Sequence, residues 1–226
     1  MDWLNRIRLL FGDDAIDKLK HSTVMVVGCG AVGSFAVEAL ARSGIGHLII
    51  IDSDKVESTN INRQLFALNS TIGLPKVDVA RNRILDINPD AQVDALNMFF
   101  DKNSDIDVRP CFVIDAIDTV PSKIALYQWC TERKIPFISS MGAAQKTDLS
   151  KIKIAPISKT SVCPLASKIR HEIKTLSLPD FPAVFSTQSP THNDGDDKHI
   201  YGSVITVTGA FGLYLANHVI DYLITK

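Results

Sequence analysis

A glycine-rich turn after a short apolar run is the feature that most limits what this chain can fold into. The run Val24–Val27 is β-branched at three of its four positions and is short enough for a buried strand. Gly28, Gly30 and Gly33 follow in G-x-G-x-x-G spacing. In such a turn the first two glycines let the backbone bend tightly and approach a phosphate, and the third lets the next helix pack closely. The spacing therefore predicts a strand, a phosphate-binding turn and a helix.

The residues after the glycines extend this unit toward a second strand. Ala31–Ser43 has helical spacing, and its first turn offers free N–H groups and the positive end of the helix dipole to an anion. The apolar run Leu48–Ile51 ends at Asp52, at the distance where an acidic residue accepts hydrogen bonds from ribose hydroxyls. These residues predict a nucleotide site, although a nicotinamide-dependent dehydrogenase would have them as well as an ATP-using enzyme.

Apolar runs and helical patterns continue to alternate over the first 150 residues. This order predicts an α/β fold, a Rossmann-like, doubly wound and mostly parallel sheet with helices on both faces and a C-terminal extension. Right-handed crossovers would bring the residues that end each strand to one edge of the sheet, where ligands bind. The residues expected at this edge are Val27, Asp52, Asp118 and Ser140. The further expected strands are Ala91–Leu96, Cys111–Ile114 and Phe137–Ser140, and the further expected helices are Val77–Ile87 and Pro121–Lys134.

The two ends of the chain have less regular patterns. Trp3–Lys20 is expected to form one or two short helices. Beyond residue 150 the sequence predicts a strand at Lys151–Ile154 and a helix at Leu165–Leu176. Pro179–Lys198 is rich in Pro, Ser, Thr, Asp and Asn, which predicts a mobile loop. Gly202–Ile224 is strongly apolar and is expected to begin as a strand or directly as a helix.

Several classes of protein are disfavoured by composition. Polar residues interrupt the C-terminal apolar segment before it reaches the length that a membrane span needs. The N-terminus lacks the apolar core of a signal peptide, so we expect a cytoplasmic protein. The four cysteines form no C-x-x-C pair, which gives no support to a structural zinc site or a disulfide framework. A net charge of −1 argues against a non-specific polyanion binder.

The stretch Ser53–Leu74 has no clean periodicity. Loops of this length inside a compact domain are usually functional or disordered. Phe66 and Leu68 can anchor this one, and four of its side chains have fixed hydrogen-bonding capacity, so we expect a structured active-site loop. The four are Asn60, Asn62, Arg63 and Gln64, and Lys76 opens the following helix.

This loop separates two reaction classes. Hydride transfer needs a nicotinamide pocket and has no requirement for Asn-x-Asn-Arg-Gln followed by a lysine. Nucleotidyl transfer to a carboxylate develops charge on the α-phosphate and on pyrophosphate, so it needs Arg, Lys and a metal. Arg63, Lys76 and Asp118 supply this set and favour adenylation. Asp115, by contrast, is expected to be a structural carboxylate at a strand end.

Five segments in order resemble the adenylating superfamily of ubiquitin-activating-type enzymes, which includes the ThiF and MoeB proteins. They are GCGAVGS, the strand ending in IDSD, TNINRQ, GLPKV and DAID. Within this superfamily the chain is most similar to the branch of tRNA threonylcarbamoyladenosine dehydratases. The segments that carry this similarity are Arg6–Gly12, Ile87–Pro89, Ser140–Lys153, Ile157–Arg170 and Val184–Thr187. The resemblance implies a single ThiF-type adenylation domain over 1–226, with an ATP-binding core at 1–150 and a substrate-facing, closing segment at 151–226.

The resemblance also implies ATP and Mg²⁺ as cofactors and gives roles to matching positions. The glycines would cradle ATP, Asp52 would hold the ribose, Asp118 would hold Mg²⁺, and Arg63 and Lys76 would neutralise the phosphates. In a homodimer, Arg6 would reach the ATP of the partner subunit, with Arg8 as the second choice. The catalytic set is then Arg63, Lys76, Asp118 and Arg6. The nucleotide-binding set is Gly28, Gly30, Ala31, Gly33, Asp52, Asp54, Asn60, Asn62, Arg63, Gln64, Lys76 and Asp118.

The implied reaction modifies tRNA. ATP would adenylate the threonyl carboxylate of threonylcarbamoyladenosine, and the carbamoyl group would then close a ring, so that the nucleoside loses water. Lys168, Arg170 and Lys174 would contact the RNA, although a solvated helix face explains the same charges. Cys163 is expected to be structural, because no thioester is needed. A sulfur-transfer partner, a cysteine desulfurase system, is a further implied contact.

Two alternatives stay open from sequence. The first is adenylation of the C-terminus of a ubiquitin-like sulfur-carrier protein, which would need a catalytic cysteine and usually zinc. The second is an NAD-dependent oxidoreductase, which would bind NAD(H) rather than ATP.

Overall fold

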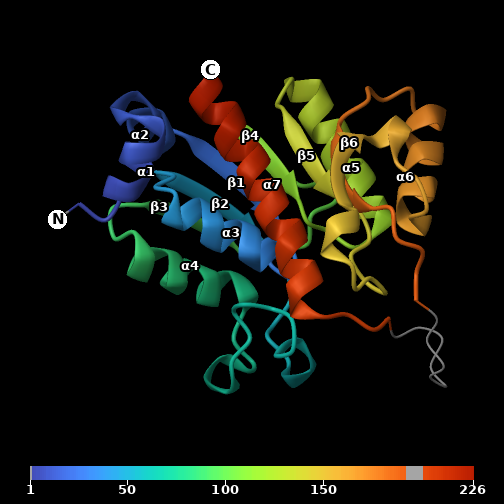
Figure 1. Ribbon diagram of the computed structural model, residues 1–226, viewed down its shortest axis with the longest axis horizontal. Helices are drawn as coiled ribbons and strands as arrows, with labels where there is room; N and C mark the ends of the chain where they lie inside the picture. Colours follow the sequence, from blue (N-terminus) through green and yellow to red (C-terminus); the bar gives the residue numbers. More distant parts are fainter. Residues whose placement is uncertain (1, 192–200) are drawn as a thin grey trace.

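A mostly parallel β-sheet runs through the molecule (Figure 1). In the computed structural model, which describes residues 2–191 and 201–226, this sheet has seven strands in the order β3-β2-β1-β4-β5-β7-β6. Neighbouring strands pair in parallel, except that β6 is antiparallel to β7. The strands are β1 (Thr23–Val27), β2 (His47–Ile51), β3 (Gln92–Leu96), β4 (Phe112–Asp115), β5 (Phe137–Ser140), β6 (Ile152–Pro156) and β7 (Pro182–Ser186).

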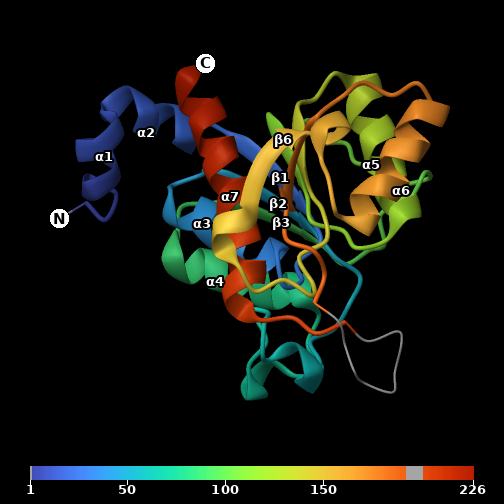
Figure 2. The ribbon, with the colours of Figure 1, turned by 45° about the vertical axis from the view of Figure 1, so that its right-hand side comes forward.

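Helices cover both faces of the sheet (Figures 1 and 2). On one face α3 packs against α4 and α7, and on the other α5 packs against α6. The doubly wound α/β fold predicted from the sequence is therefore confirmed. The helices are α1 (Asn5–Phe11), α2 (Asp13–Lys20), α3 (Gly33–Arg42), α4 (Lys76–Ile87), α5 (Val120–Arg133), α6 (Pro164–Thr175) and α7 (Ile205–Thr225). Short 3₁₀ turns are η1 (Ser58–Asn60), η2 (Asn69–Thr71), η3 (Leu149–Lys151) and η4 (Ile157–Lys159).

The continuous apolar character of the central strands follows from burial on both faces. In β1, Val24 and Val26 belong to the core beneath α3 and α7, whereas Met25 and Val27 belong to the core beneath α5 and α6. All four side chains are buried. The central strands are thus fixed on both faces, and their C-terminal ends form a rigid edge for a site.

The segment Pro179–Lys198 differs from the sequence prediction. It was expected to be a mobile loop, but Pro182–Ser186 forms β7, which lies between β5 and β6 in the sheet. Ala183–Phe185 is buried and supplies the apolar contacts that stabilise a strand there. The turn-rich residues on both sides obscured this short run, and residues 192–198 of the prediction lie outside the described part.

The closing segment is a helix rather than a strand followed by a helix. The backbone at Val204 is extended. Helix α7 then begins at Ile205, ends at Thr225 and packs against α3 and the sheet. Within the described residues, no helix combines the length and apolar character that a membrane crossing requires. The N-terminal helices α1 and α2 are separated at Gly12.

Candidate nucleotide and adenylation site

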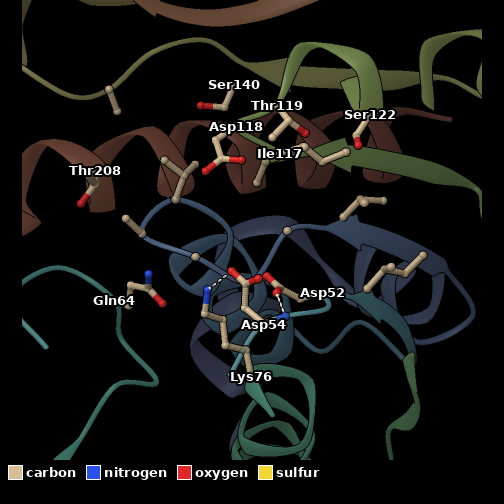
Figure 3. A pocket seen from close by; sticks show the side chains of 18 of the residues that line it. Asp52, Asp54, Gln64, Lys76, Ile117, Asp118, Thr119, Ser122, Ser140 and Thr208 are labelled. Carbon is tan, nitrogen blue, oxygen red and sulfur yellow. Dashed lines mark hydrogen bonds and ion pairs between the residues drawn. The ribbon is translucent and has the colours of Figure 1, made fainter. Parts of the chain in front are cut away.

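One pocket collects most of the predicted site residues. It has a volume of about 440 Å³ and lies at the C-terminal edge of β1, β2, β4 and β5. Ligands bind at this edge in open α/β sheets. Figure 3 shows Asp118, Thr119 and Ser122 on one wall and Asp52, Asp54 and Lys76 on the opposite wall. The predicted residues that line the pocket are Gly28, Gly30, Ala31, Asp52, Asp54, Asn60, Arg63, Gln64, Lys76 and Asp118.

The glycine-rich turn makes room in two different ways. Gly28 has φ of +95°, and a Cβ there would lie 2.6 Å from the carbonyl oxygen of Ala116. Gly33 does not line the pocket; a Cβ there would lie only 1.7 Å from the carbonyl oxygen of Gly28. Gly30 faces the pocket and has open space around it, with Gln64 Nε2 at 3.9 Å from a built Cβ. Gly28 therefore lets the turn after β4 approach closely, Gly33 lets α3 pack against the turn after β1, and Gly30 leaves space for a ligand.

Substitution at Gly33 and Gly30 should separate stability from binding. Gly33→Ala is expected to lower the free energy of unfolding by about 1–3 kcal/mol or more, because its methyl group overlaps backbone atoms. Gly30→Ala is expected to change the free energy of unfolding by less than about 0.5 kcal/mol and yet to weaken ATP binding about tenfold or more, because the methyl group would occupy the space predicted for a phosphate. Chemical denaturation and ATP calorimetry on both variants check this, and a Gly30→Ala protein that binds ATP normally would contradict it.

Asp52 is fixed at the end of β2 by two backbone donors. Its carboxylate accepts from the N–H of Cys29 at 2.6 Å and from the N–H of Asp54 at 2.8 Å. Burial raises the pKa of Asp52, although nearby Lys76 and the two backbone donors act in the opposite direction. This carboxylate is held next to the glycine turn, where the sequence predicted a ribose contact.

Lys76 provides a buried positive charge beside the same turn. Only 5% of the residue is exposed, and its Nζ lies 2.7 Å from Oδ2 of Asp54. The N–H of Lys76 also donates to the carbonyl oxygen of Asp54 at 2.9 Å. The Asp54 side chain is 65% exposed, so the carboxylate is the more solvated partner of the pair. A phosphate entering the pocket would find an oriented ammonium group already at its wall.

The Asn60–Gln64 segment is ordered, as predicted. Some of its residues line the pocket, and another orients a pocket residue. Asn60, Arg63 and Gln64 line the pocket. Asn62 does not, but its Oδ1 accepts from Nη1 of Arg63 at 2.9 Å, and Arg63 also donates to the carbonyl oxygen of Thr59 at 2.7 Å. Asn62 in turn donates to the carbonyl oxygen of Ser203, at the start of the segment leading to α7. Asn62 therefore orients Arg63 rather than facing the pocket itself.

Asp118 supplies an exposed carboxylate on the wall opposite Lys76 (Figure 3). Among the residues of the described ranges, no cluster of three or more His, Cys, Asp or Glu side chains is placed to hold a metal by itself. One carboxylate together with substrate phosphates and water is the usual Mg²⁺ arrangement in phosphoryl and nucleotidyl transfer sites. The donor set therefore fits a Mg²⁺ ion that arrives with ATP.

Arg6 is not brought to this pocket within one chain. It lies in α1, which packs near the opposite edge of the sheet, where Leu4 contacts Gly44. Arg8 is paired with Asp2 and Asp13, each at 2.6 Å, whereas no such pair forms at Arg6 in the described part of the chain. Any role of Arg6 at ATP thus requires a second subunit.

The three basic residues predicted to contact RNA do not form one exposed group. Lys168 and Lys174 are exposed on α6, and His171 lies between them on the same face. Arg170 is half-buried, and its Nη1 donates to Oγ1 of Thr160 at 2.6 Å. Arg170 therefore connects α6 to the preceding turn. Lys168 and Lys174 remain candidates for contact with RNA.

Part of the pocket was missed by sequence reasoning. Most of these residues follow the ends of β3, β4 and β5, at the same edge as the predicted ones, so strand ends were the available signal for them. Leu165 and Thr208 come from α6 and α7 instead. The backbone N–H of Asp52 donates to the carbonyl oxygen of Leu96, which places the segment after β3 next to Asp52. The missed lining residues include Met98–Phe100, Ile117, Thr119, Ser122, Met141–Ala144, Leu165 and Thr208.

Comparison with known proteins gives matches over nearly the whole chain. The model of the ThiF family matches residues 4–226. A tRNA threonylcarbamoyladenosine dehydratase of Bacillus subtilis is 47% identical over 190 residues, which are 82% of this chain and 75% of the relative. The Escherichia coli tRNA N6-threonylcarbamoyladenosine dehydratase in complex with ATP is 33% identical with a TM-score of 0.91, and the match covers 98% of this chain and 93% of that chain. Its complex with AMP is 34% identical with the same TM-score and coverage. The fold, the glycine turn and these matches agree, and the chain belongs to the ThiF family.

Proposed function

We propose that this protein is an ATP-dependent tRNA threonylcarbamoyladenosine dehydratase. The observation that carries the proposal is the convergence of Lys76, Arg63 and Asp118 on one pocket that also contains the glycine turn. Relatives that carry this name match the chain over most of their length, and one of them has been solved with ATP and with AMP. We place the reaction in a single adenylation domain formed by the whole chain.

The proposed reaction has two steps. A carboxylate oxygen of the threonyl group attacks the α-phosphorus of ATP, and pyrophosphate leaves. An atom of the carbamoyl group then attacks the activated carbonyl carbon, a ring closes, and AMP leaves with the carboxylate oxygen. Lys76 and Arg63 neutralise charge on the phosphates, Asp52 orients the ribose, and the rigid strand ends hold both substrates in place. No covalent enzyme intermediate is needed.

Mg²⁺ is part of the proposal. Asp118 would hold it, and the ion would supply charge neutralisation on the phosphates of ATP. The exposure of Asp118 toward the pocket supports this role, because the carboxylate is accessible to an ion that enters with the nucleotide.

The exposed lysines of α6 are proposed as phosphate contacts for tRNA. Leu165 lines the pocket, and Lys168 follows it by three residues on the same face of α6. Lys168→Ala and Lys174→Ala should each weaken tRNA binding and lower the slope of log affinity against log salt by about one. Binding titrations over a salt series check this against Lys20→Ala, which lies at the other edge of the sheet. Unchanged slopes in both α6 variants would contradict the assignment.

We further propose a homodimer in which α1 lies in the interface. None of the α1 residues is buried, and Trp3, Leu9, Leu10 and Phe11 are exposed, with Leu9 at 80%. Apolar side chains gathered in this way usually mark an interaction surface. A second copy of the chain covers them and brings Arg6 toward the ATP of its partner.

Subunit mixing tests the role of Arg6. Arg6→Ala should lower adenylation by about 10²-fold, whereas Arg8→Ala, whose side chain is occupied by two carboxylates, should have a much smaller effect. Mixing Arg6→Ala with Lys76→Met subunits should restore roughly a quarter of the wild-type sites, because each mixed dimer has one intact site. Normal activity of Arg6→Ala, or no recovery on mixing, would contradict action across the interface.

The alternatives receive less support. Cys29, Cys130 and Cys163 are buried, and Cys111 is exposed but lies before β4, at the edge away from the pocket. Burial raises the pKa of the Cys29 thiol, so this cysteine in the glycine turn is a poor nucleophile. A sulfur-carrier reaction that passes through a cysteine is therefore disfavoured. Hydride transfer does not require the combination of Lys76 and Arg63 in one pocket. The sulfur-transfer partner and the cytoplasmic location stay predictions.

AMP formation tests the proposal against both alternatives. The protein is incubated with ATP and tRNA that either carries or lacks threonylcarbamoyladenosine. AMP should appear only with the modified tRNA. AMP formation on a small carrier protein would favour the first alternative, and NAD(H) binding without ATP binding would favour the second.

A further inference from the structure

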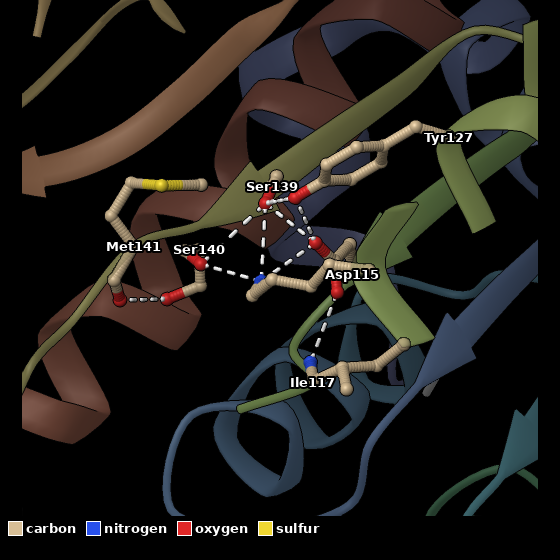
Figure 4. A network of polar contacts seen from close by, with 7 residues as sticks. Asp115, Ile117, Tyr127, Ser139, Ser140 and Met141 are labelled. Atoms are coloured by element: carbon tan, nitrogen blue, oxygen red, sulfur yellow. Dashed lines mark hydrogen bonds and ion pairs between the residues drawn. The ribbon is translucent and has the colours of Figure 1, made fainter. Parts of the chain in front are cut away.

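A buried polar cluster lies directly behind the pocket. It consists of Asp115, Lys123, Tyr127 and Ser139, which we call the buried tetrad. All four residues are fully buried, and Lys123 Nζ lies 2.7 Å from Oδ2 of Asp115. The same carboxylate oxygen accepts from Oη of Tyr127 at 2.8 Å and from Oγ of Ser139 at 2.6 Å (Figure 4). Burial and the nearby Asp115 raise the pKa of Tyr127, so its hydroxyl keeps its proton and remains a donor.

The tetrad reaches the first wall of the pocket through Asp115. Its second oxygen, Oδ1, accepts from the backbone N–H of Ile117 at 3.0 Å. Ala116–Thr119 line the pocket, and Asp118 is the proposed Mg²⁺ ligand within this turn. The carboxylate of Asp115 thus anchors the turn that holds Asp118.

Lys123 connects the tetrad to the second wall. Its Nζ donates to the carbonyl oxygen of Ser140 at 2.8 Å and contacts Oγ of Ser139 at 3.3 Å, so its three protons all have acceptors. Ser140 and the turn Met141–Ala144 line the pocket across from the glycine loop. One ammonium group therefore links the turn after β5 to the turn after β4.

The contacts of Lys123 lie at the point where β4 and β5 stop pairing. Backbone pairing between β4 and β5 ends at the partners Asp115 and Ser139. Beyond them Ser140 pairs with β7 and Ala116 donates its N–H to β1, so the two segments diverge and form separate pocket walls. Side chains therefore connect the two segments where the β4–β5 backbone ladder stops. A buried ion pair adds little stability compared with apolar side chains of similar volume, which makes a role in fixing geometry the better explanation of its presence.

We propose that the buried tetrad positions the Asp118 turn and the Ser140–Ala144 turn relative to each other, so that ATP and the acceptor carboxylate meet in reactive geometry. Its members are positioning residues, since none of them lines the pocket. The effect expected on kinetics rests on the proposed function, whereas the effect expected on the two turns does not depend on that function.

Hydrogen exchange gives the structural test. Tyr127→Phe keeps the ring, which packs against Phe137 and Phe181, and removes one donor to Asp115. Ser139→Ala removes another. In each variant, without nucleotide, amide exchange in 116–119 and 140–144 should become about tenfold faster, while exchange in β1 and α3 should not change. Tyr214→Phe, on the exposed side of α7, is the matched control. Unchanged exchange in the two turns, or equal acceleration throughout the protein, would overturn the inference.

Kinetics give the functional test. With modified tRNA present, both variants should lower kcat for ATP–pyrophosphate exchange about tenfold and change the KM for ATP less than about twofold, because Lys76 and Arg63 are untouched. A lower melting temperature with unchanged kcat at a permissive temperature would overturn the inference. If the wild-type protein shows no exchange activity at all, the proposed function fails instead.

A variant in which all four tetrad residues are replaced by apolar ones distinguishes a positioning role from an effect on stability alone. The combination Asp115→Leu, Lys123→Met, Tyr127→Phe and Ser139→Ala removes every polar member, so no charge is left unpaired and the protein should fold. It should keep a cooperative thermal transition and show fast exchange at both turns with a strongly lowered kcat. A folded quadruple variant with wild-type kcat would overturn the inference; if it does not fold, the two single variants decide.

Discussion

Arg63→Ala is expected to lower ATP–pyrophosphate exchange by about 10²–10³-fold while leaving the fold intact. The arginine lines the pocket, and its guanidinium is oriented by the carbonyl oxygen of Thr59 and by Asn62. Positive charge held at the phosphates stabilises the transition state more than the ground state, so the loss should appear in kcat. Because Arg63 is only half-buried and its partners remain solvated, stability should change by less than about 1 kcal/mol.

The matched control is Arg81→Ala, an exposed arginine of α4 that does not line the pocket. It should retain wild-type exchange and stability. Asn62→Ala should give an intermediate loss, because it removes one of the contacts that orient Arg63. Wild-type turnover by Arg63→Ala would show that the Asn60–Gln64 segment does not act on the phosphates.

Lys76→Met is the second change with a large expected effect. Met has nearly the length of the lysine stem and fills the same buried space, so only the charge is lost. The Asp54 carboxylate left behind is 65% exposed and stays solvated, so the cost in stability should be below about 1 kcal/mol. Exchange activity should fall by about 10²–10³-fold, and ATP binding should weaken, because both ground state and transition state carry phosphate charge.

Calorimetry with ATP and steady-state exchange assays check the lysine variant. Lys20→Met, an exposed lysine at the end of α2, is the control and should behave as wild type. A Lys76→Met protein that binds ATP and exchanges pyrophosphate normally would mean that the Lys76–Asp54 pair only stabilises the start of α4.

The sequence predicted the sheet well where residues are buried on both faces. Val24–Val27 and Leu48–Ile51 are apolar at every position, and the composition of the flanking segments does not obscure this pattern. The prediction of a loop at Pro182–Ser186 was wrong, because a short buried strand between turn-rich segments has too few residues to outweigh the composition of those segments. Its pairing with β5 and β6 is a tertiary contact that no local pattern contains.

The site could be predicted as far as residue types dictate chemistry. The glycine spacing, Asp52, Arg63, Lys76 and Asp118 all reach one pocket. Whether a side chain lines that pocket or supports another depends on packing, and here Asn62 and Arg170 differ from their expected positions. Gly33 packs α3 closely, as its spacing predicted, but does not line the pocket. No sequence pattern distinguishes Lys123, because a lysine in a helix is usually solvated and only the structure shows it fully buried against Asp115.

Mass spectrometry of tRNA nucleosides tests the central claim most directly. The protein is incubated with ATP, Mg²⁺ and tRNA that contains threonylcarbamoyladenosine, the tRNA is digested, and the nucleoside masses are measured, with Lys76→Met as the inactive control. We expect threonylcarbamoyladenosine to be replaced by a product lighter by the mass of one water, only with the wild-type protein and only with ATP. An unchanged nucleoside in the presence of ATP-binding protein would contradict the account.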